Sequence, residues 1–559
     1  MAIDTLEGIA DSFLPFPDVV SWNSGDPQKV QLSFCQKVQY VAAKVFQFFK
    51  KLFILPFACV YSMGKYAVTL FKGKTKETPI EGPADASVLP EHFGFADSLF
   101  QTSGLGTEHS ATKLEGVADW GDGFMSPKTI EGTEDRDYKK FFVDVLGNPD
   151  PYIDLLKKQN VSAHRFSMEW AVMQPEKGGP YNKEAIQKYA NFIHKLKEAG
   201  IEPYVTLHHF VCPKWFKEIG GFEKRENIAL YKKYALDMMR EFKNVTHWMP
   251  FNEINVDGFQ KLVRGVYPPA RTGDIAGCAN MMRNMLMAHC LVYQEAKKMW
   301  PELQIGSSHQ WINFEPLEGN PLERAICYYL SKITHYACYN FFKTGKFTMD
   351  IPVVANVQME IPAKEFQENN RFSDFMGVQF YGYPRLKAGF NGWHEYPGYK
   401  INNVPYIGLT FGSTCPRGGE AMSFGPGFYP ESLDKCLKEA VAIGKPLVIS
   451  ETGCDARVQR HGDKDFRIDN EVQKRYFEKI FPILAKYKEH LKGFFAWTLI
   501  RSHLEWDRGA FPQLGMVNIL KDKNRNIIGA QASPAAELLQ KIYGEARQRE
   551  EEGLLLHSS

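Results

Sequence analysis

The stretch His247–Glu253, HWMPFNE, places a glutamate directly after a short run of apolar and strand-forming residues. The stretch 446–451, PLVISE, repeats this arrangement and ends in Glu451. The chain has 65 acidic residues, so some glutamates will follow strands by chance. The residues around both stretches must therefore decide whether the two glutamates act together.

Other apolar runs of the same kind occur along most of the chain, at 93–96, 162–167, 203–208, 305–309, 375–381 and 493–498. Longer amphipathic stretches generally follow them, including 183–199, 227–242, 277–299, 431–443, 469–488 and 533–546. Strands that alternate with helices predict a parallel sheet. Eight such units predict an α/β fold, the closed (β/α)₈ or TIM barrel.

The barrel would bring Glu253 and Glu451 together. Functional residues in this fold lie at the carboxyl ends of the strands. Glu253 would follow the fourth strand and Glu451 the seventh, so both side chains are expected at one mouth. Two carboxyl groups placed in this way are what cleavage of a glycosidic bond requires, one as the acid and the other as the nucleophile.

Composition and charge exclude some classes of protein. The net charge of +2 argues against a general nucleic-acid binder. The aromatic content of 14% suits sugar binding, although core packing explains most of it. None of the ten cysteines forms a C-x-x-C pair, which argues against a zinc knuckle and favours reduced thiols in a cytoplasmic protein. The acidic amino terminus lacks the basic region of a secretory signal.

Residues 27–76 differ from the rest, because they contain nine lysines and no acidic residue. Phenylalanine and aliphatic residues lie between the lysines, and Lys37, Lys44 and Lys51 recur on one side of a helix. The longest uncharged run, 52–64, is shorter than the roughly 20 residues that a spanning helix needs. This pattern predicts helices that lie at a membrane surface, so the protein would be cytoplasmic and peripheral. A helical arm that docks on its own barrel or on a second subunit is the alternative.

Three regions follow from these patterns. Residues 1–90 are predicted to be a helical N-terminal extension with a linker at its end. Residues 91–546 would form the barrel, and residues 547–559 a polar tail.

Several short motifs, in order, resemble those of the family-1 glycoside hydrolases, the retaining β-glycosidases, over roughly residues 91–545. Asn252-Glu253-Ile254 is similar to the family's Asn-Glu-Pro, and Glu451-Thr452-Gly453 to its Glu-Asn-Gly. The resemblance implies that Glu253 is the acid/base and Glu451 the nucleophile. It further implies that Arg165, in Arg165-Phe166-Ser167, contacts the nucleophile and that Tyr381 hydrogen-bonds it. Both contacts would favour the charged form of Glu451.

The resemblance also implies a set of sugar-binding residues, with no metal and no organic cofactor. By position in the family motifs these are Gln101, His209, Asn252, Trp497, Glu505 and Trp506. Glu505 argues against the 6-phospho branch of the family, which has a small residue there. The choice between a glucose-type and a galactose-type sugar stays open.

Departures from the family pattern mark a divergent member. Ile254 replaces a proline, Thr452 an asparagine, and Gln379 stands where asparagine is usual. Arg501 occupies a position where an acidic residue is common, and the stretch Trp497–Trp506 is one residue longer than usual.

Three functions are therefore considered. The first is a retaining β-glycosidase that acts on a carbohydrate or glycoside and is held at a membrane surface by residues 27–76. The second is a membrane-associated transglycosylase or galactosyltransferase that acts on glycolipids with the same two glutamates. The third is a non-catalytic sugar-binding barrel.

Overall fold

The structure is a computed structural model of the 559-residue chain. It describes residues 18–23, 26–31, 33, 36, 82–120, 141–316, 319, 321–351, 354–387, 410–412, 420–422, 428–460, 466–501, 504–506, 509 and 512–558.

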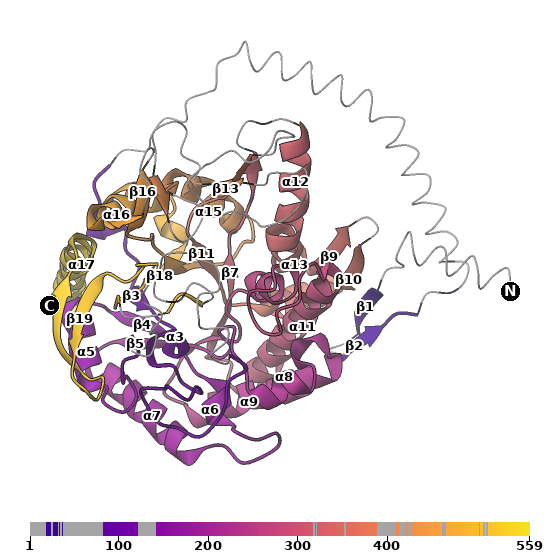
Figure 1. Ribbon diagram of the computed structural model, residues 1–559, viewed down its shortest axis with the longest axis horizontal. Helices are drawn as coiled ribbons and strands as arrows, with labels where there is room; N and C mark the ends of the chain where they lie inside the picture. The colour runs from indigo at the N-terminus through magenta and orange to yellow at the C-terminus, as the bar shows by residue number, and fades with distance from the viewer. Residues whose placement is uncertain are drawn as a thin grey trace, which may run out of the picture.

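Eight parallel strands close into a barrel at the centre of the molecule (Figure 1). In chain order they are β3 (His92–Ala96), β4 (Ala163–Ser167), β5 (Glu202–Thr206), β6 (His247–Met249), β7 (Gln304–Gln310), β11 (Phe375–Phe380), β15 (Leu447–Thr452) and β18 (Leu491–Trp497). Each strand pairs with the next, and β18 pairs with β3 to close the ring. The predicted (β/α)₈ barrel is confirmed, and each strand overlaps the run predicted for it.

Helices surround the barrel, as Figure 1 shows. The α-helices are α3 (Leu99–Ser103), α5 (Asp150–Lys158), α6 (Trp170–Met173), α7 (Lys183–Glu198), α8 (Lys214–Glu218), α9 (Ile228–Glu241), α10 (Ile254–Gly258), α11 (Ile275–Met299), α12 (Pro321–Ser331), α13 (Ala337–Thr344), α14 (Ala363–Glu368), α15 (Leu433–Val441), α16 (Asn470–Ala485) and α17 (Pro534–Ser558). Single π-helical turns, η5 (Phe259–Val263) and η6 (Lys332–Tyr336), follow α10 and α12. Residues 547–558, predicted as a polar tail, continue α17.

Local chemistry explains where the long outer helices begin. The side chains of Asn182, Asp274 and Asp469 accept hydrogen bonds from backbone N–H groups in the first turns of α7, α11 and α16. Such caps satisfy N–H groups that have no partner inside the helix. Basic residues lie in the last turns of α7 and α11, where they oppose the negative end of the helix dipole.

The barrel interior is filled by side chains, and one strand requires a glycine. Tyr204, Met249, Phe375 and Phe495 are buried in one cluster that also contains Trp497. A Cβ atom on Gly94 of β3 would lie 2.0 Å from the carbonyl oxygen of Ala163, so no other residue fits without a shift of the backbone. Such packing fixes the strand ends that carry the polar side chains.

A second sheet on the flank of the barrel includes residues from the N-terminal extension. Its order is β2 (Asp26–Lys29), β1 (Asp18–Asn23), β10 (Ala355–Glu360) and β9 (Lys346–Ile351). β1 runs parallel to β10 (Figure 1). The buried Trp22 donates from Nε1 to Glu365 Oε1 at 2.6 Å. Within the predicted helical extension, Asp18–Asn23 and Asp26–Lys29 therefore form a β-hairpin and Ala86–Val88 a 3₁₀ turn, while residues 1–17 and 37–81 lie outside the described residues.

Three small sheets complete the described fold. They are β13 (Thr410–Gly412), β12 (Arg385–Lys387) and β8 (Glu315–Pro316); β14 (Glu420–Met422), β16 (Arg457–Arg460) and β17 (Arg467–Ile468); and β19 (Val517–Lys521) with β20 (Ile527–Ala532). Single 3₁₀ turns are η1 (Ala86–Val88), η3 (Gly221–Glu223), η4 (Arg225–Asn227), η7 (Asn370–Phe372), η8 (Pro430–Ser432) and η9 (Lys488–His490). Within the described ranges, none of the helices combines the length and the apolar character that crossing a membrane demands.

Candidate active site

Glu451 lies near the end of β15 and accepts hydrogen bonds from three side chains. Arg165 Nη1 lies 2.5 Å and Gln379 Nε2 2.6 Å from Glu451 Oε1. The Tyr381 hydroxyl lies 2.7 Å from Glu451 Oε2. β4 carries Arg165, and β11 carries Gln379 and ends just before Tyr381. Donors of this kind stabilise a carboxylate in its charged form.

The burial of these donors matters for their chemistry. Burial, followed by the charge of Glu451, raises the pKa of Tyr381 well above 10, so its hydroxyl stays protonated and donates. Arg165 is fully buried, and the ion pair with Glu451 supplies the counter-charge that a buried guanidinium needs. Thr452, which replaces the asparagine of the family pattern, also contributes to the site. Its hydroxyl donates to Phe380 O at 2.9 Å and ties β15 to β11.

Asn252 is held in one orientation by two of the same donors. Its Oδ1 accepts from Arg165 Nη2 at 2.6 Å and from Gln379 Nε2 at 2.7 Å. The opposite end of the amide, Nδ2, is buried and has no partner among the described residues. Rotating the amide would place Nδ2 against two donors, so Nδ2 must remain the group offered for recognition.

Glu253 follows Asn252 and has the properties of a proton donor. It is buried at the start of α10, with a left-handed φ of 41°. Burial raises the pKa of Glu253 well above 4.5, and the negative charge of Glu451 raises it further. The two carboxyl groups are thus driven to opposite protonation states, which is the division of roles that acid/base and nucleophilic chemistry requires.

His209 is sandwiched between two indole rings. Its ring centroid is 5.8 Å from that of Trp497 and 5.8 Å from that of Trp506, with interplanar angles of 29° and 26°. Burial and the nearby charge of Arg165 lower the pKa of His209 well below 6.5, so the imidazole is neutral. Its Nδ1 has no partner among the described residues.

Gln101 and Glu505 are a further pair of neighbouring side chains in the site. Gln101 Nε2 donates to Leu504 O at 2.6 Å and lies 3.5 Å from Glu505 Oε2. Both side chains are buried, and Gln101 Oε1 has no partner among the described residues. The site residues singled out in the sequence therefore lie in or just after the barrel strands or in the loops that follow them. Arg165, Asn252, Tyr381 and Glu451 form one set of contacts, and His209, Trp497 and Trp506 form another.

Gln379 is the site residue that the sequence analysis did not include. It was noted only as a departure, yet its Nε2 contacts both Glu451 and Asn252. The signal was available, because Gln379 and Tyr381 are two residues apart and successive residues of a strand alternate between its faces. Arg501, the other departure, donates instead to Gly515 O and Asn470 Oδ1.

Four polar atoms of the site are therefore buried without a protein partner in the described structure. They are Gln101 Oε1, His209 Nδ1, Asn252 Nδ2 and Gln379 Oε1. A buried polar atom without a partner costs about 1–3 kcal/mol. Three of these atoms belong to side-chain amides whose other end is already hydrogen-bonded, so the set can both donate to and accept from hydroxyl groups. A polyhydroxylated ligand matches such a set.

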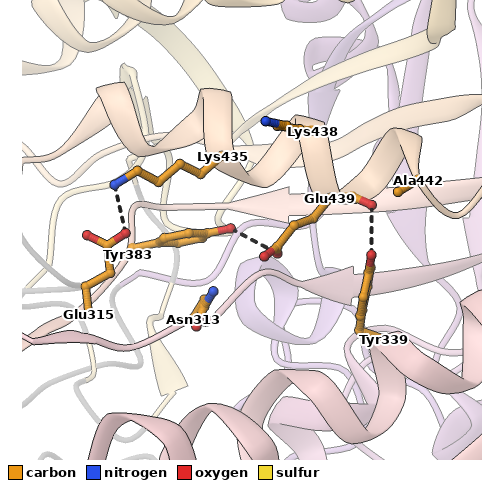
Figure 2. A pocket seen from close by; sticks show the side chains of 8 residues that line it. All are labelled: Asn313, Glu315, Tyr339, Tyr383, Lys435, Lys438, Glu439 and Ala442. Carbon is orange, nitrogen blue, oxygen red and sulfur yellow. Dashed lines mark hydrogen bonds and ion pairs between the residues drawn. The ribbon is translucent and has the colours of Figure 1, made fainter. Parts of the chain in front are cut away.

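A separate cavity of about 440 Å³ lies on the outer side of the barrel (Figure 2). Its walls come from α15, α13 and the residues after β7 and β11, and its charged groups are largely paired. Lys435 Nζ lies 3.0 Å from Glu315 Oε1, while Glu439 Oε2 lies 3.2 Å from His335 Nε2 and 3.5 Å from the Tyr383 hydroxyl. Arg165, Gln379 and Tyr381, which donate to Glu451, do not line this cavity. In the part of the chain that the structure describes, no group of three or more His, Cys, Asp or Glu side chains is arranged to hold a metal ion.

Known proteins resemble this chain in sequence and in fold. The chain is 25% identical to a 6-phospho-beta-galactosidase of Streptococcus equi subsp. zooepidemicus over 458 residues, which cover 77% of this chain and 93% of that protein. It is 24% identical to the 6-phospho-beta-galactosidase of Staphylococcus haemolyticus over 459 residues, with the same coverage.

Among solved structures, a rice beta-glucosidase matches with a TM-score of 0.65 at 20% identity, covering 82% of this chain and 99% of that one. A family 1 beta-glucosidase from Thermotoga maritima matches with a TM-score of 0.63 at 19% identity, covering 82% and 98%. These structural matches support the barrel fold. The model of glycosyl hydrolase family 1 matches residues 87–530, and the chain belongs to that family.

Proposed function

We propose that the protein is a retaining β-glycosidase that removes a terminal β-linked sugar of the glucose or galactose type. One observation carries the proposal. Glu451 is held by three donors, while its neighbour Glu253 is buried with a pKa raised well above 4.5. One carboxyl group is thus suited to attack and the other to protonate a leaving group.

The reaction proceeds in two displacements. A carboxylate oxygen of Glu451 attacks the anomeric carbon, and Glu253 transfers its proton to the glycosidic oxygen as that bond breaks. The first product leaves, and the sugar remains joined to Glu451 as an ester. Glu253, now a carboxylate, takes a proton from water, whose oxygen attacks the anomeric carbon and releases Glu451. Two inversions give net retention.

The sugar-binding side of the site suits an unphosphorylated sugar. Glu505 is buried beside Gln101, where it adds negative charge to a site that already contains Glu451 and Glu253. Two like charges 4 Å apart repel by about 4 kcal/mol at the effective dielectric of a protein surface. A sugar 6-phosphate would meet this repulsion, although the relatives compared above are 6-phospho-beta-galactosidases.

The sugar preference can be tested with one substitution. We expect the protein to cleave 4-nitrophenyl β-glucoside or β-galactoside and to leave the 6-phosphorylated analogues largely intact. Glu505→Ser should lower kcat/KM for the neutral sugar by about 100-fold, because hydroxyl partners are lost. A wild-type protein that prefers the 6-phosphorylated substrate would refute this part of the proposal.

The double-displacement mechanism can be tested by trapping. A 2-deoxy-2-fluoro glycoside should inactivate the protein with one covalent label per chain, and peptide mapping should place the label on Glu451. Glu451→Gln should abolish both labelling and turnover while the melting temperature changes little. A folded wild-type protein that binds sugar but takes no label would instead favour the non-catalytic sugar-binding barrel.

A second candidate function concerns the acceptor in the second displacement. The lysine-rich, acid-free sequence 27–76 motivates it, because such a segment suits an anionic membrane surface. In this proposal the protein is a peripheral membrane enzyme, and a hydroxyl of a second glycolipid replaces water as the acceptor. Incubation with vesicles of galactosyl glycerolipid separates the two, since mass spectrometry would find oligosaccharide-extended lipid after transfer and only free sugar after hydrolysis.

A further inference from the structure

A buried network of three charged or titratable side chains lies directly behind Glu253. Asp257, on α10, is one turn after Glu253, and its N–H donates to Glu253 O at 2.9 Å. Asp257 Oδ2 lies 2.9 Å from His208 Nε2, and Asp257 Oδ1 lies 2.9 Å from Lys261 Nζ. The Asp257 carboxyl is fully buried, and Lys261 is only 4% exposed. We call Asp257, His208 and Lys261 the Asp257 network.

The network joins the elements that carry the acid/base and the sugar-binding histidine. His208 follows β5 and directly precedes His209. Its backbone oxygen accepts from the N–H of Asn252 at 2.8 Å, so the peptide just before Glu253 is fixed to the same residue that pairs with Asp257. Lys261, in η5, ties the following π-helical turn to α10.

Packing alone does not explain why these residues are charged. Burying an ammonium and a carboxylate costs several kcal/mol of solvation, and apolar residues of similar volume are often equally stable or more stable. The network is not isolated in the core, because it borders a residue with a constrained backbone. Glu253 has a φ of 41°, a left-handed conformation that a non-glycine residue adopts only where its surroundings hold it. The bonds from Asp257 N and to His208 O hold this peptide on both sides.

The network also contributes to the charge that Glu253 experiences. After burial, the charged groups that act on the pKa of Glu253 are Glu451, Arg165, Glu505 and Asp257. Lys261 and His208 act on Asp257, and although burial raises the pKa of Asp257, their combined effect holds it below 3.8. Asp119 and Cys212 in turn face Lys261. A negative Asp257 therefore opposes loss of the proton from Glu253, and Lys261 limits that effect.

We propose that Asp257 is a positioning residue for Glu253: it holds the acid/base backbone through its own N–H and through His208, and its buried charge, balanced by Lys261, adds to the negative charge around the Glu253 carboxyl. The inference rests on the proposed function, in which Glu253 supplies the proton. It assigns a role in acid catalysis to a charge pair that makes no contact with Glu451 among the interactions described above.

The first experiment measures kcat/KM against pH for the full-length protein and three variants. Asp257→Asn keeps the shape of the side chain and removes the negative charge, so the alkaline limb should move to lower pH by about one unit. Lys261→Met removes the positive charge, so the same limb should move to higher pH. The double variant should return toward the wild-type profile. Asp237→Asn, a matched change in the surface ion-pair cluster of α9, should leave the profile unchanged.

The second experiment separates acid assistance from general damage to the site. A 2,4-dinitrophenyl glycoside needs little protonation of its leaving group, whereas an alkyl glycoside needs it fully. Asp257→Asn should lower kcat/KM, which reports only the first displacement, at least tenfold for the alkyl glycoside and leave that of the dinitrophenyl glycoside within about twofold. An equal loss on both substrates would mean that Asp257 is merely structural.

The outcomes distinguish this inference from the proposed function. If wild-type protein takes no fluoro-sugar label on Glu451, the proposed function fails. If wild type is labelled but neither Asp257→Asn nor Lys261→Met moves the alkaline limb, the inference alone is overturned. If Asp257→Asn fails to fold, Lys261→Met tests the inference instead, because that variant retains the Asp257–His208 contact. An alkaline limb that does not move to higher pH in Lys261→Met would then overturn the inference.

Discussion

At the scale of single residues, Gln379 shares two acceptors, Glu451 Oε1 and Asn252 Oδ1, with Arg165. Its amide nitrogen donates to Glu451 Oε1 and to Asn252 Oδ1, at 2.6 and 2.7 Å. It therefore aligns the carboxylate of the proposed nucleophile with an amide that faces the sugar. The longer side chain, compared with the asparagine usual in the family, spans both acceptors from β11.

Replacing Gln379 by leucine should impair catalysis more than folding. A hydrogen bond to a charged group contributes about 1.5–3 kcal/mol, so kcat/KM should fall about 10- to 100-fold. Steady-state kinetics on a nitrophenyl glycoside would measure this. Gln379→Glu serves as the matched control of equal length. It should be at least as inactive, because it places a second negative charge against Glu451.

Most of the residues proposed for the site could be named from the sequence. The contacts that could not be predicted share one physical cause. Glu253 and Glu451 lie at the ends of recognisable apolar runs, so their convergence could be predicted from the barrel, whereas the role of Arg165 was expected only from the family resemblance. The contacts of Gln379 with Glu451 and Asn252, and of Asp257 with His208, could not be predicted, because these partners lie far away in the chain. Hydrogen bonds between such distant groups leave no local periodicity or propensity to detect.

At the scale of elements, the N-terminal hairpin is part of the packed fold. β1 adds to the edge of β10, more than 300 residues away, and Trp22 is buried at 1% exposure against Phe372. The barrel strands were predictable because each is a continuous apolar run followed by a helix. β1 and β2 were not, because a short hairpin gains its stability from a distant edge rather than from its own pattern.

Trp22→Ala should destabilise the protein by about 3–5 kcal/mol, the usual cost of removing a buried tryptophan. Trp22→Phe keeps an aromatic ring and loses mainly the bond to Glu365, so it should cost about 1–2 kcal/mol. Urea denaturation of both variants gives the comparison. Equal unfolding midpoints for Trp22→Ala and wild type would show that the hairpin does not stabilise the barrel.

At the scale of the whole molecule, buried histidines make the fold sensitive to acid. Burial lowers the pKa values of His164 and His289 to about 4, against roughly 6.5 in an unfolded chain. Between these values the unfolded chain binds protons that the folded chain does not, so the free energy of unfolding falls as pH falls from 6.5 to 4. Glu169 acts in the opposite sense, because burial raises its pKa to about 7. Because these groups change the free energy of unfolding in opposite directions, the contribution of each is measured by replacing one residue at a time.

His164→Gln should remove one contribution to this acid sensitivity. Between pH 7 and pH 4 the variant should lose about 3 kcal/mol less stability than wild type, since glutamine cannot bind the proton. Chemical denaturation at several pH values would measure the difference. His194→Gln, a change at an exposed position of α7, should follow the wild-type curve. A His164→Gln curve parallel to wild type would contradict the prediction.

The hairpin has a further consequence for how the chain is held together. The chain leaves β2 on one flank of the barrel and is attached again at η1 near α17, on the opposite flank in Figure 1, where Asp85 pairs with Arg549 at 3.4 Å. β2 and η1, the described elements on either side of this stretch, are thus both attached to the barrel. Were the chain cut between them, the hairpin would be held only by non-covalent contacts, including its pairing with β10 and the packing of Trp22 against Phe372.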